Sequence, residues 1–359
     1  MDYKIITDEA GFLAEKENWN AICARMEDKT PFQSWQWNYY WWKHNEPADS
    51  LFIIKAFEGK QVFGYAPIVV KKKTAQFIGD RHFDYGMFVC AERKREIFDL
   101  FIKVLLEKQG KKRISLCCIP AVCDQFSLFK ESALASKKIA FREQVSTANV
   151  HLTEYDGFEG YLQAISASIR KKAIKPCIKA GISFQLEDFS EEVWQAVGEI
   201  FADRQEQRTA VGDLEWAKPI VRDLQAEGIL KIATLWYEGE RCAYLIYFEN
   251  SEKYYIWLTA FKQTGSYRLG HFVRYHLIQE AYQNSKHTVD MMRGAYEYKK
   301  HWDCNVAYNY EYKVFGSAIG RNVYLLKMAI KMKIRKTVYA STGLTALYKK
   351  MTVKVSGKK

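Results

Sequence analysis

Two stretches of the chain alternate apolar and polar residues on either side of a Gly-containing turn, and this pattern predicts β-hairpins. The first stretch, at 50–70, reads SLFIIKAFEGKQVFGYAPIVV and turns near Gly59. The second, at 228–250, reads GILKIATLWYEGERCAYLIYFEN and turns near Gly239. A single match of this kind is common, so the flanking pattern decides whether the two halves of the chain are related.

The flanking pattern repeats in the same order around both hairpins. Helical periodicity precedes each hairpin, and a further strand region, a helix and an apolar strand follow it. The predicted helices lie at 8–26, 34–44, 93–109, 191–208, 214–227 and 270–284, and the apolar strands at 113–118 and 288–292. The repeated order predicts one α+β unit used twice, in domains 1–145 and 146–317, followed by a basic tail at 318–359.

Composition narrows the class of protein. The chain has 359 residues, of which 48% are hydrophobic and 15% aromatic, so it can bury the cores of two domains. No apolar run reaches the roughly 18 residues of a membrane span, and the first residues do not resemble a signal peptide. The cysteines are scattered without a CxxC pair, and the histidines do not fall at ligand spacing. We therefore expect a cytoplasmic protein without a metal site.

The positive charge is confined to one part of the chain. Of the 54 Lys and Arg residues, twelve lie after Glu311, and 42 remain to balance the 42 Asp and Glu residues. No acidic residue follows Glu311. The net charge of +12 therefore belongs to the tail and indicates a basic appendage, not a basic globular face.

The tail also has a helical apolar stripe beside its basic residues. Its apolar positions are Ile319, Val323, Leu326, Ile330 and Ile334. A basic amphipathic helix can lie at the inner face of the membrane, on anionic lipid, or it can pack its stripe on the protein body. We expect packing on the body, with peripheral membrane contact through 318–359 as the alternative. Nucleic acid is not an expected partner, because no recognised binding module accompanies the charge.

Between the halves, the stretch at 166–188 predicts a basic helix interrupted by Pro176 and followed by a strand. Its positive stripe consists of Arg170, Lys171, Lys172, Lys175 and Lys179. Such a stripe is either a solvated helix face or a phosphate-binding edge where the halves meet.

The order of elements in the second half resembles the GNAT (GCN5-related N-acetyltransferase) fold. In that fold a strand offers backbone N–H groups to a thioester, and the next helix offers its N-terminus to the cofactor pyrophosphate. The resemblance implies donor-binding residues in the strand at 254–261 and in the following turn and helix. These residues are Trp257, Leu258, Thr259, Gly265, Ser266, Arg268, Leu269, Gly270 and His271.

Three further motifs resemble an acetyltransferase-like family of bacterial cellulose and exopolysaccharide clusters, which is related to Fem-type peptidoglycan aminoacyltransferases. They are TPFQSWQWNYYWWKHN at 30–45, FIGDRHFDYGMFV at 77–89 and VDMMRGAYEYKKHWDC at 289–304. The likeness spans most of residues 30–315 and excludes the basic tail. An Arg/Gln-x-x-Gly-x-Gly/Ala signature is matched only in part by the residues after Arg268.

The resemblance implies candidate residues for catalysis and acceptor binding. The last motif supplies Arg293 and Glu297 for the substrate, Tyr298 or Tyr296 as acid, and Lys299 to offset negative charge. Packing in the core is the alternative role for Tyr298. The first half supplies Asp84 as the base or as the group that orients the nucleophile. Apart from the resemblance, His82 and Tyr85 share a glycine-flanked loop with Asp84, which suits a cleft. Arg204 and Arg208 lie four apart on one predicted helix face, where they either bind the substrate or are solvated.

The expected function is acyl transfer from acetyl-CoA or another acyl-CoA to a sugar or other cell-envelope or exopolysaccharide precursor. The acceptor would attack the thioester directly, without a covalent enzyme intermediate. Two alternatives stay open. One is a Fem-like transferase that uses aminoacyl-tRNA, and the other is a non-catalytic component of a polysaccharide assembly complex.

Overall fold

The computed structural model describes residues 1–359 except 81, 110–112, 207–213, 295 and 341–359. Its strands form one sheet in the order β1-β2-β3-β6 and a ten-stranded sheet in the order β4-β5-β7-β14-β8-β13-β12-β11-β10-β9. The strands are β1 (Asp2–Ile6), β2 (Ile53–Glu58), β3 (Gln61–Ala66), β4 (Ile68–Lys71), β5 (Thr74–Phe77), β6 (Val89–Cys90), β7 (Arg113–Pro120), β8 (Ile139–His151), β9 (Ser183–Glu187), β10 (Leu230–Tyr237), β11 (Glu240–Glu249), β12 (Lys253–Phe261), β13 (Thr288–Arg293) and β14 (Asn305–Val314).

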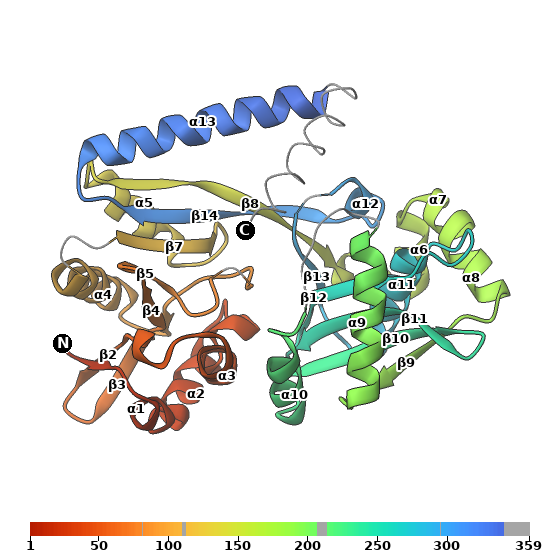
Figure 1. Cartoon of the computed structure of the whole chain (residues 1–359), viewed down its shortest axis with the longest axis horizontal. Helices are drawn as coiled ribbons and strands as arrows, with labels where there is room; N and C mark the ends of the chain where they lie inside the picture. The colour runs from red at the N-terminus through yellow and green to blue at the C-terminus, as the bar shows by residue number, and fades with distance from the viewer. Residues whose placement is uncertain (81, 110–112, 207–213, 295, 341–359) are drawn as a thin grey trace.

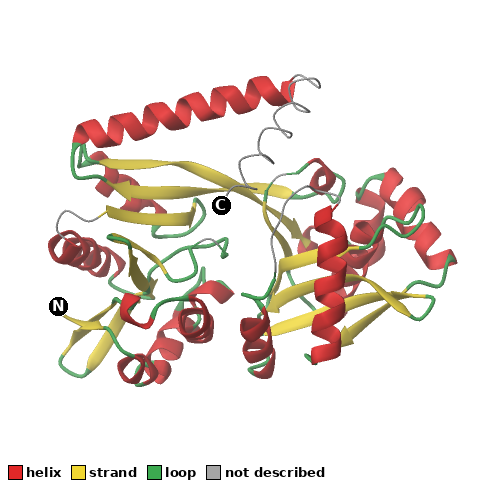
Figure 2. Ribbon diagram, viewed as in Figure 1, coloured by secondary structure: helices red, strands yellow, loops and turns green. Residues whose placement is uncertain are grey.

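Helices cover both sheets (Figure 2). They are α1 (Glu9–Leu13), α2 (Lys16–Arg25), α3 (Trp35–Asn45), α4 (Lys94–Gln109), α5 (Phe126–Leu134), α6 (Gly157–Ala164), α7 (Ala167–Ile169), α8 (Lys175–Lys179), α9 (Glu191–Glu206), α10 (Lys218–Ala226), α11 (Leu269–Gln283), α12 (Glu297–Lys300) and α13 (Ala318–Ala340). A π-helical segment, Arg170–Ile174, joins α7 to α8 directly before Pro176. The expected α+β class, with mixed sheets flanked by helices and a basic helical tail, is confirmed.

Two long strands join two lobes of the molecule (Figure 1). The first lobe contains β1 to β7 and α1 to α5, and the second contains β9 to β13 and α6 to α12. Strand β8 pairs along its length with β14, and its last residues also pair with β13. Residues 145 and 146, between which the sequence divides the domains, lie inside β8. The two lobes are therefore built on shared strands and not joined by a linker.

The second hairpin forms as expected and the first differs in one respect. Strands β10 and β11 are joined by Glu238 and Gly239, which have φ angles of 52° and 83°, as the tight turn of a twisted hairpin requires. In the first stretch, β2 and β3 form the hairpin, but β3 ends at Ala66 and β4 enters the other sheet. Pro67 lies between them, and it lacks the N–H that would continue the ladder.

The Trp-rich helix α3 connects the lobes. The Ser34 hydroxyl caps the helix by accepting a hydrogen bond from the Trp37 backbone N–H at 3.1 Å. Its other end faces α10, where His44 Nε2 lies 2.7 Å from Asp223 Oδ2 and the Tyr40 hydroxyl donates to Glu227 at 2.9 Å. These contacts hold α3 of the first lobe against α10 of the second.

Buried side chains form two cores. The larger core fills the first lobe and continues onto the face of the second-lobe sheet that α9 and α10 cover. The smaller core lies on the other face of that sheet, under α6 to α8 and α11. The larger core thus crosses from one lobe to the other, beneath the site described below.

The basic tail contains a long helix, α13, that follows β14 (Figure 1). The expectation that its apolar stripe packs on the body is wrong for the described residues, because all five stripe residues are exposed. Among the described residues, no helix is both long enough and apolar enough to cross a membrane.

Candidate active site

Strands β12 and β13 run parallel but separate after a short contact. Their pairing ends with Tyr255 opposite Asp290, while β12 stays paired with β11 on its other edge. Trp257 is an extra residue in β12, because the register with β11 shifts between Ile246 and Tyr247. Within the described part of the chain, no strand pairs with the β13 side of β12 beyond Tyr255. Backbone groups of β12 near Trp257 therefore face a gap between the strands.

The turn after β12 leads into the N-terminus of α11. Gly265 takes a left-handed φ of 52° in this turn, and Arg268 is exposed at the start of the helix. A Cβ atom on Gly270 would lie 2.4 Å from the Phe261 ring, so only glycine lets the helix approach β12 this closely. Among the described residues, none accepts a hydrogen bond from the N–H of Leu269 or Gly270. These donors suit an anion such as a pyrophosphate.

His271 differs from the other residues of this turn because its ring points into the protein. Its Nδ1 accepts a hydrogen bond from Trp302 Nε1 at 3.1 Å, and burial lowers the pKa of His271 to about 4. The ring is therefore neutral near pH 7 and packs with Trp302, which is fully buried.

Lys299 is a buried residue that binds backbone carbonyl groups at the end of β13. The side chain is 2% exposed, and its ammonium donates to the carbonyl oxygens of Met291, Met292 and Arg293 at 2.7, 2.8 and 2.9 Å. Burial, followed by the charge of Arg274, lowers the pKa of Lys299 to about 8. The three carbonyl acceptors favour the charged form, so the cation holds the strand end in place at neutral pH.

Asp290 supports the same strand end from the other side. Its carboxylate accepts hydrogen bonds from the Met292 backbone N–H at 2.7 Å and from the Tyr85 hydroxyl at 2.5 Å. Burial raises the pKa of Asp290 to about 7. Met292 has a φ of 60°, which is strained for a side chain of its size. Asp290 and Lys299 together hold this strained bulge, which aims Arg293 out of the strand.

Arg293 binds the first lobe. Its backbone N–H and its Nε both donate to the Asp84 carboxylate at 2.7 Å, and Nη2 donates to the Phe83 carbonyl at 2.6 Å. Asn309 of β14 in turn donates to the Asp84 carbonyl at 2.5 Å. The end of β13 is therefore fixed to the loop that follows β5.

Tyr298 lies beside Arg274 of α11. Arg274 Nη2 donates to the Tyr298 hydroxyl at 3.3 Å, and its guanidinium lies 4.8 Å from the centre of the Tyr298 ring. Arg274 also donates to the carbonyl oxygen of Gly270. This arginine thus connects the start of α11 to the segment that contains Tyr298.

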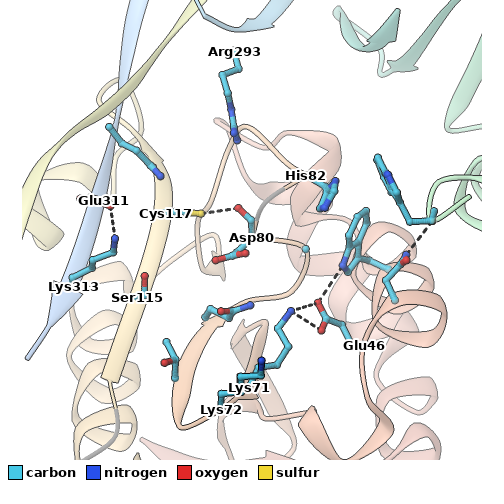
Figure 3. Close-up of a pocket in the computed structure, with 17 residues that line it drawn as sticks. Glu46, Lys71, Lys72, Asp80, His82, Ser115, Cys117, Arg293, Glu311 and Lys313 are labelled. Atoms are coloured by element: carbon cyan, nitrogen blue, oxygen red, sulfur yellow. Dashed lines mark hydrogen bonds and ion pairs between the residues drawn. The ribbon is translucent and has the colours of Figure 1, made fainter. Parts of the chain in front are cut away.

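A cavity of about 830 Å³ lies where the lobes meet (Figure 3). Residues of α3, the β4–β5 hairpin, the loop after β5, β7, β8 and β14 line it, together with Trp216 and Arg293 from the second lobe. Its charged residues are Lys71, Lys72, Arg293 and Lys313 on the one hand and Glu46, Asp80 and Glu311 on the other. Glu46 pairs with Lys71 at 2.8 Å, and Glu311 pairs with Lys313 at 2.7 Å. Among the described residues, Lys72 has no ion-pair partner.

Aromatic side chains form the wall of the cavity nearest the second lobe. The His82 ring centre lies 4.8 Å from that of Trp41 and 4.2 Å from that of Trp216. Trp257 of β12 donates from Nε1 to the His82 carbonyl at 2.8 Å. The cavity and the gap between β12 and β13 are therefore adjacent. Trp257, at the gap, contacts His82 of the cavity wall, and Arg293, at the end of β13, lines the cavity.

The candidates from the sequence fall into separate places. His82 and Arg293 line the cavity, whereas Asp84 and Tyr85 are buried behind it. Tyr296 is 61% exposed, and Glu297 is exposed and paired with Lys300. Arg204 lies on α9, and Arg208 lies outside the described residues. Trp257, Leu258 and Thr259 lie at the β12 bulge, while Gly265, Ser266, Arg268, Leu269, Gly270 and His271 lie in the turn and the start of α11.

Several site residues escaped the sequence argument. Asp290 is the second residue of the quoted motif at 289–304, and a lone acid in an apolar strand could have marked it. Trp41 lies in the quoted motif at 30–45, but the resemblance assigns it no role in the site. Trp216 and Lys72 carry no local signal, because their neighbours in the cavity come from distant parts of the chain. Among the described residues, no three His, Cys, Asp or Glu side chains lie close enough together to bind one metal ion.

Comparison with known proteins places a recognised domain in the second lobe. A family model described as "Acetyltransferase (GNAT) domain" matches residues 167–300, which run from α7 through α12. No curated protein matches the chain in a sequence search. The matched segment contains the β12 bulge, the α11 turn and Lys299.

Solved structures resemble nearly the whole chain. The crystal structure of FemX aligns with a TM-score of 0.65 at 12% identity, over 91% of this chain and 99% of that chain. L-PGS from Bacillus licheniformis aligns with a TM-score of 0.60 at 12% identity, over 90% and 97%. A tandem GNAT protein from the clavulanic acid biosynthesis pathway aligns with a TM-score of 0.53 at 12% identity, over 87% and 97%. At this identity the likeness establishes a shared tandem fold and not a shared reaction.

Proposed function

We propose that this protein is an acyltransferase that takes an acyl group from an acyl-CoA bound at β12 and α11. The acceptor is an amine or a hydroxyl group of a molecule held in the cavity between the lobes. One observation carries the proposal. The gap at the β12 bulge adjoins the cavity, since Trp257 reaches His82 and Arg293 lines the cavity wall.

Each part of the proposed site has a chemical task. Those backbone N–H groups of Trp257, Leu258 and Thr259 that face the gap, and not β11, donate to the thioester carbonyl oxygen, and each such donor typically lowers the barrier by about 3 kcal/mol. The start of α11, with exposed Arg268, binds the pyrophosphate.

The proposed reaction forms a bond from the acceptor nitrogen or oxygen to the acyl carbon and breaks the carbon–sulfur bond. The thiolate that leaves takes a proton from Tyr298, whose hydroxyl accepts a hydrogen bond from Arg274. The acceptor proton passes to a base that lines the cavity, and Asp80 and His82 are the groups of suitable chemistry. Asp84, which holds Arg293 through two hydrogen bonds, acts by orienting that residue.

The proposed acceptor is a sugar or another precursor of a cell-envelope polymer or exopolysaccharide. The cavity volume of about 830 Å³ suits a ligand of that size. Its aromatic wall suits the apolar face of a sugar ring, and its exposed Lys72 suits a phosphate or carboxylate on the same molecule.

Calorimetric titration of the full chain with acetyl-CoA tests the donor site. We expect binding that Arg268→Glu weakens by about tenfold or more, because the variant replaces a cation at the pyrophosphate site with an anion. Arg113→Glu, at the exposed first residue of β7 in the first lobe, is the matched control and should bind as the parent does. Absence of binding at millimolar acetyl-CoA would overturn acyl-CoA as the donor.

A second candidate is transfer from aminoacyl-tRNA. Lys299 follows the aromatic Tyr298 as in the Fem-type ending, and Lys171, Lys172, Lys175 and Lys179 are exposed near the start of the matched domain. Transfer of a labelled amino acid from charged tRNA, in the absence of acyl-CoA binding, would favour this reaction. A chain that uses neither donor would be a non-catalytic component of an assembly complex.

A further inference from the structure

Helix α13 contacts the body with one face of its first turns. Arg321 Nε donates to the Ile139 carbonyl of β8 at 3.2 Å. The Tyr324 hydroxyl accepts a hydrogen bond from Lys313 at 3.0 Å, and the Tyr324 ring lies 5.2 Å from that of Phe315. This face orients the helix along the long strands β8 and β14 (Figure 1).

The opposite face of α13 is apolar and exposed. The stripe residues are Ile319, Val323, Leu326, Ile330 and Ile334, and Ile319 and Leu326 are 76% and 63% exposed. Because successive residues of a helix are about 100° apart, this stripe lies roughly opposite Arg321 and Tyr324. The stripe cannot pack on the body while those two contacts hold, and an outward apolar row of this length marks an interaction surface.

Basic residues lie beside the exposed stripe. Lys327 and Lys333 border it on its two sides, Lys331 lies between the stripe and the side that faces the body, and all three are exposed. No Asp or Glu residue occurs after Glu311. The outward face thus combines an apolar centre with basic edges.

We propose that α13 docks this face on the surface of an anionic lipid bilayer, with the helix lying parallel to the membrane plane. The stripe enters the boundary between headgroups and acyl chains, and the lysines contact anionic headgroups, which is the arrangement that basic amphipathic helices adopt. The inference is independent of the reaction at the active site.

Charge and composition distinguish this partner from two others. A second copy that paired stripe to stripe would bring two sets of lysines together, without any acid in the tail to offset their repulsion. A nucleic acid would match the lysines but not five outward aliphatic side chains, because bases stack on aromatic rings. Anionic lipid satisfies both the apolar and the basic part of the surface.

Vesicle sedimentation of the full chain tests the proposal. Vesicles of phosphatidylcholine alone are compared with vesicles in which half of the lipid is phosphatidylglycerol. We expect binding to the anionic vesicles only, with a partition coefficient that decreases as salt is added. Leu326→Glu with Ile330→Glu should lower that coefficient by about tenfold or more, and so should Lys327→Glu with Lys331→Glu.

Matched variants separate docking from a general effect of charge or folding. Lys327→Arg with Lys331→Arg keeps the charge and should bind as the parent does. Val122→Glu with Leu134→Glu adds two carboxylates at exposed apolar sites of the first lobe and should also bind. The α13 variants change exposed residues, so their thermal midpoints should equal the parent's.

Four results would overturn the proposal. They are absence of binding to anionic vesicles, equal binding to both kinds of vesicle, a parent dimer in sedimentation velocity that Leu326→Glu with Ile330→Glu dissociates, and retention of vesicle binding by the α13 glutamate variants. Tight binding of tRNA that the lysine variants lose, without any vesicle binding, would assign the surface to nucleic acid instead.

Discussion

The two lobes repeat one architecture but contribute to the candidate site in different ways. The second lobe offers mainly backbone, at the β12 bulge and at the start of α11. The first lobe offers mainly side chains, which line most of the cavity. In the proposed reaction, the thioester and pyrophosphate of the donor are bound mainly by backbone N–H groups, and Arg268 adds a positive charge. An acceptor site must recognise one molecule, and side chains supply that specificity.

The family model matches the second lobe, at residues 167–300. The matched stretch contains the β12 bulge, the turn after β12 and the start of α11. Most residues that line the cavity lie outside it. The variants below test this difference between the two lobes, in order of decreasing expected effect.

Replacing Lys299 by Met should have the largest effect, because Lys299 holds the end of β13 in place. It leaves three buried carbonyl oxygens without their donor, so we expect the free energy of unfolding to fall by about 3 kcal/mol or more. Denaturant unfolding measures the loss. Lys300→Met is the control, because Lys300 is exposed, and an equal loss in both variants would contradict the bracing role of Lys299.

Asp290 should make stability depend on pH. Its folded pKa is about 7 against an ordinary 3.8, so between these values the folded state binds more protons than the unfolded chain. The free energy of unfolding should therefore fall as pH rises through this window, by about 4 kcal/mol from this group. Asp290→Asn should remove that slope in urea titrations at a series of pH values. Exposed Asp156→Asn should leave it unchanged, and a slope that survives Asp290→Asn would assign it to another group.

Asp84 and Arg293 form an ion pair between the two lobes at the site. A double-mutant cycle measures the coupling free energy of this pair. Asp84→Asn and Arg293→Met should each lower turnover by about tenfold, and the coupling energy should be about 1–3 kcal/mol. Additive losses in turnover would instead mean that Asp84 acts separately, as a base.

Trp257 provides a weaker connection between the lobes. Trp257→Phe removes the hydrogen bond to His82, at a cost of about 1 kcal/mol in stability. We expect KM for the acceptor to rise several-fold while the donor Kd stays constant. Trp236→Phe, whose indole bonds remain within the second lobe, should leave KM unchanged. A weaker donor Kd in Trp257→Phe alone would show that the indole side chain contacts the donor.

Substitution of Lys72 tests whether first-lobe side chains bind the acceptor, and it has the smallest expected effect. Lys72→Ala should raise KM for an anionic acceptor by about fivefold and leave the thermal midpoint unchanged, because the side chain is exposed in the cavity. Lys73→Ala is the matched control, since Lys73 is also exposed and has positive φ but lies outside the cavity. Equal KM values in the two variants would show that Lys72 does not bind the acceptor.

The sequence by itself determined the elements that depend on local patterns. Alternation about Gly239 fixed the second hairpin, and 3.6-residue periodicity located α3, α4, α9 and α11 within a few residues. The turn at Gly265 and the stretch from Arg293 to Trp302 could be singled out because glycine, aromatic and basic residues follow one another there in a recognisable order.

Only the tertiary structure decided which distant residues meet. Pro67 moves β4 into the other sheet, and β8 and β14 extend through both lobes, so the cavity draws on segments from Trp41 to Lys313. The same packing buries Asp84 and Tyr85 and turns the α13 stripe outward. Local propensity carries no information about such contacts, because their energy is gained only when strands far apart in the chain have paired.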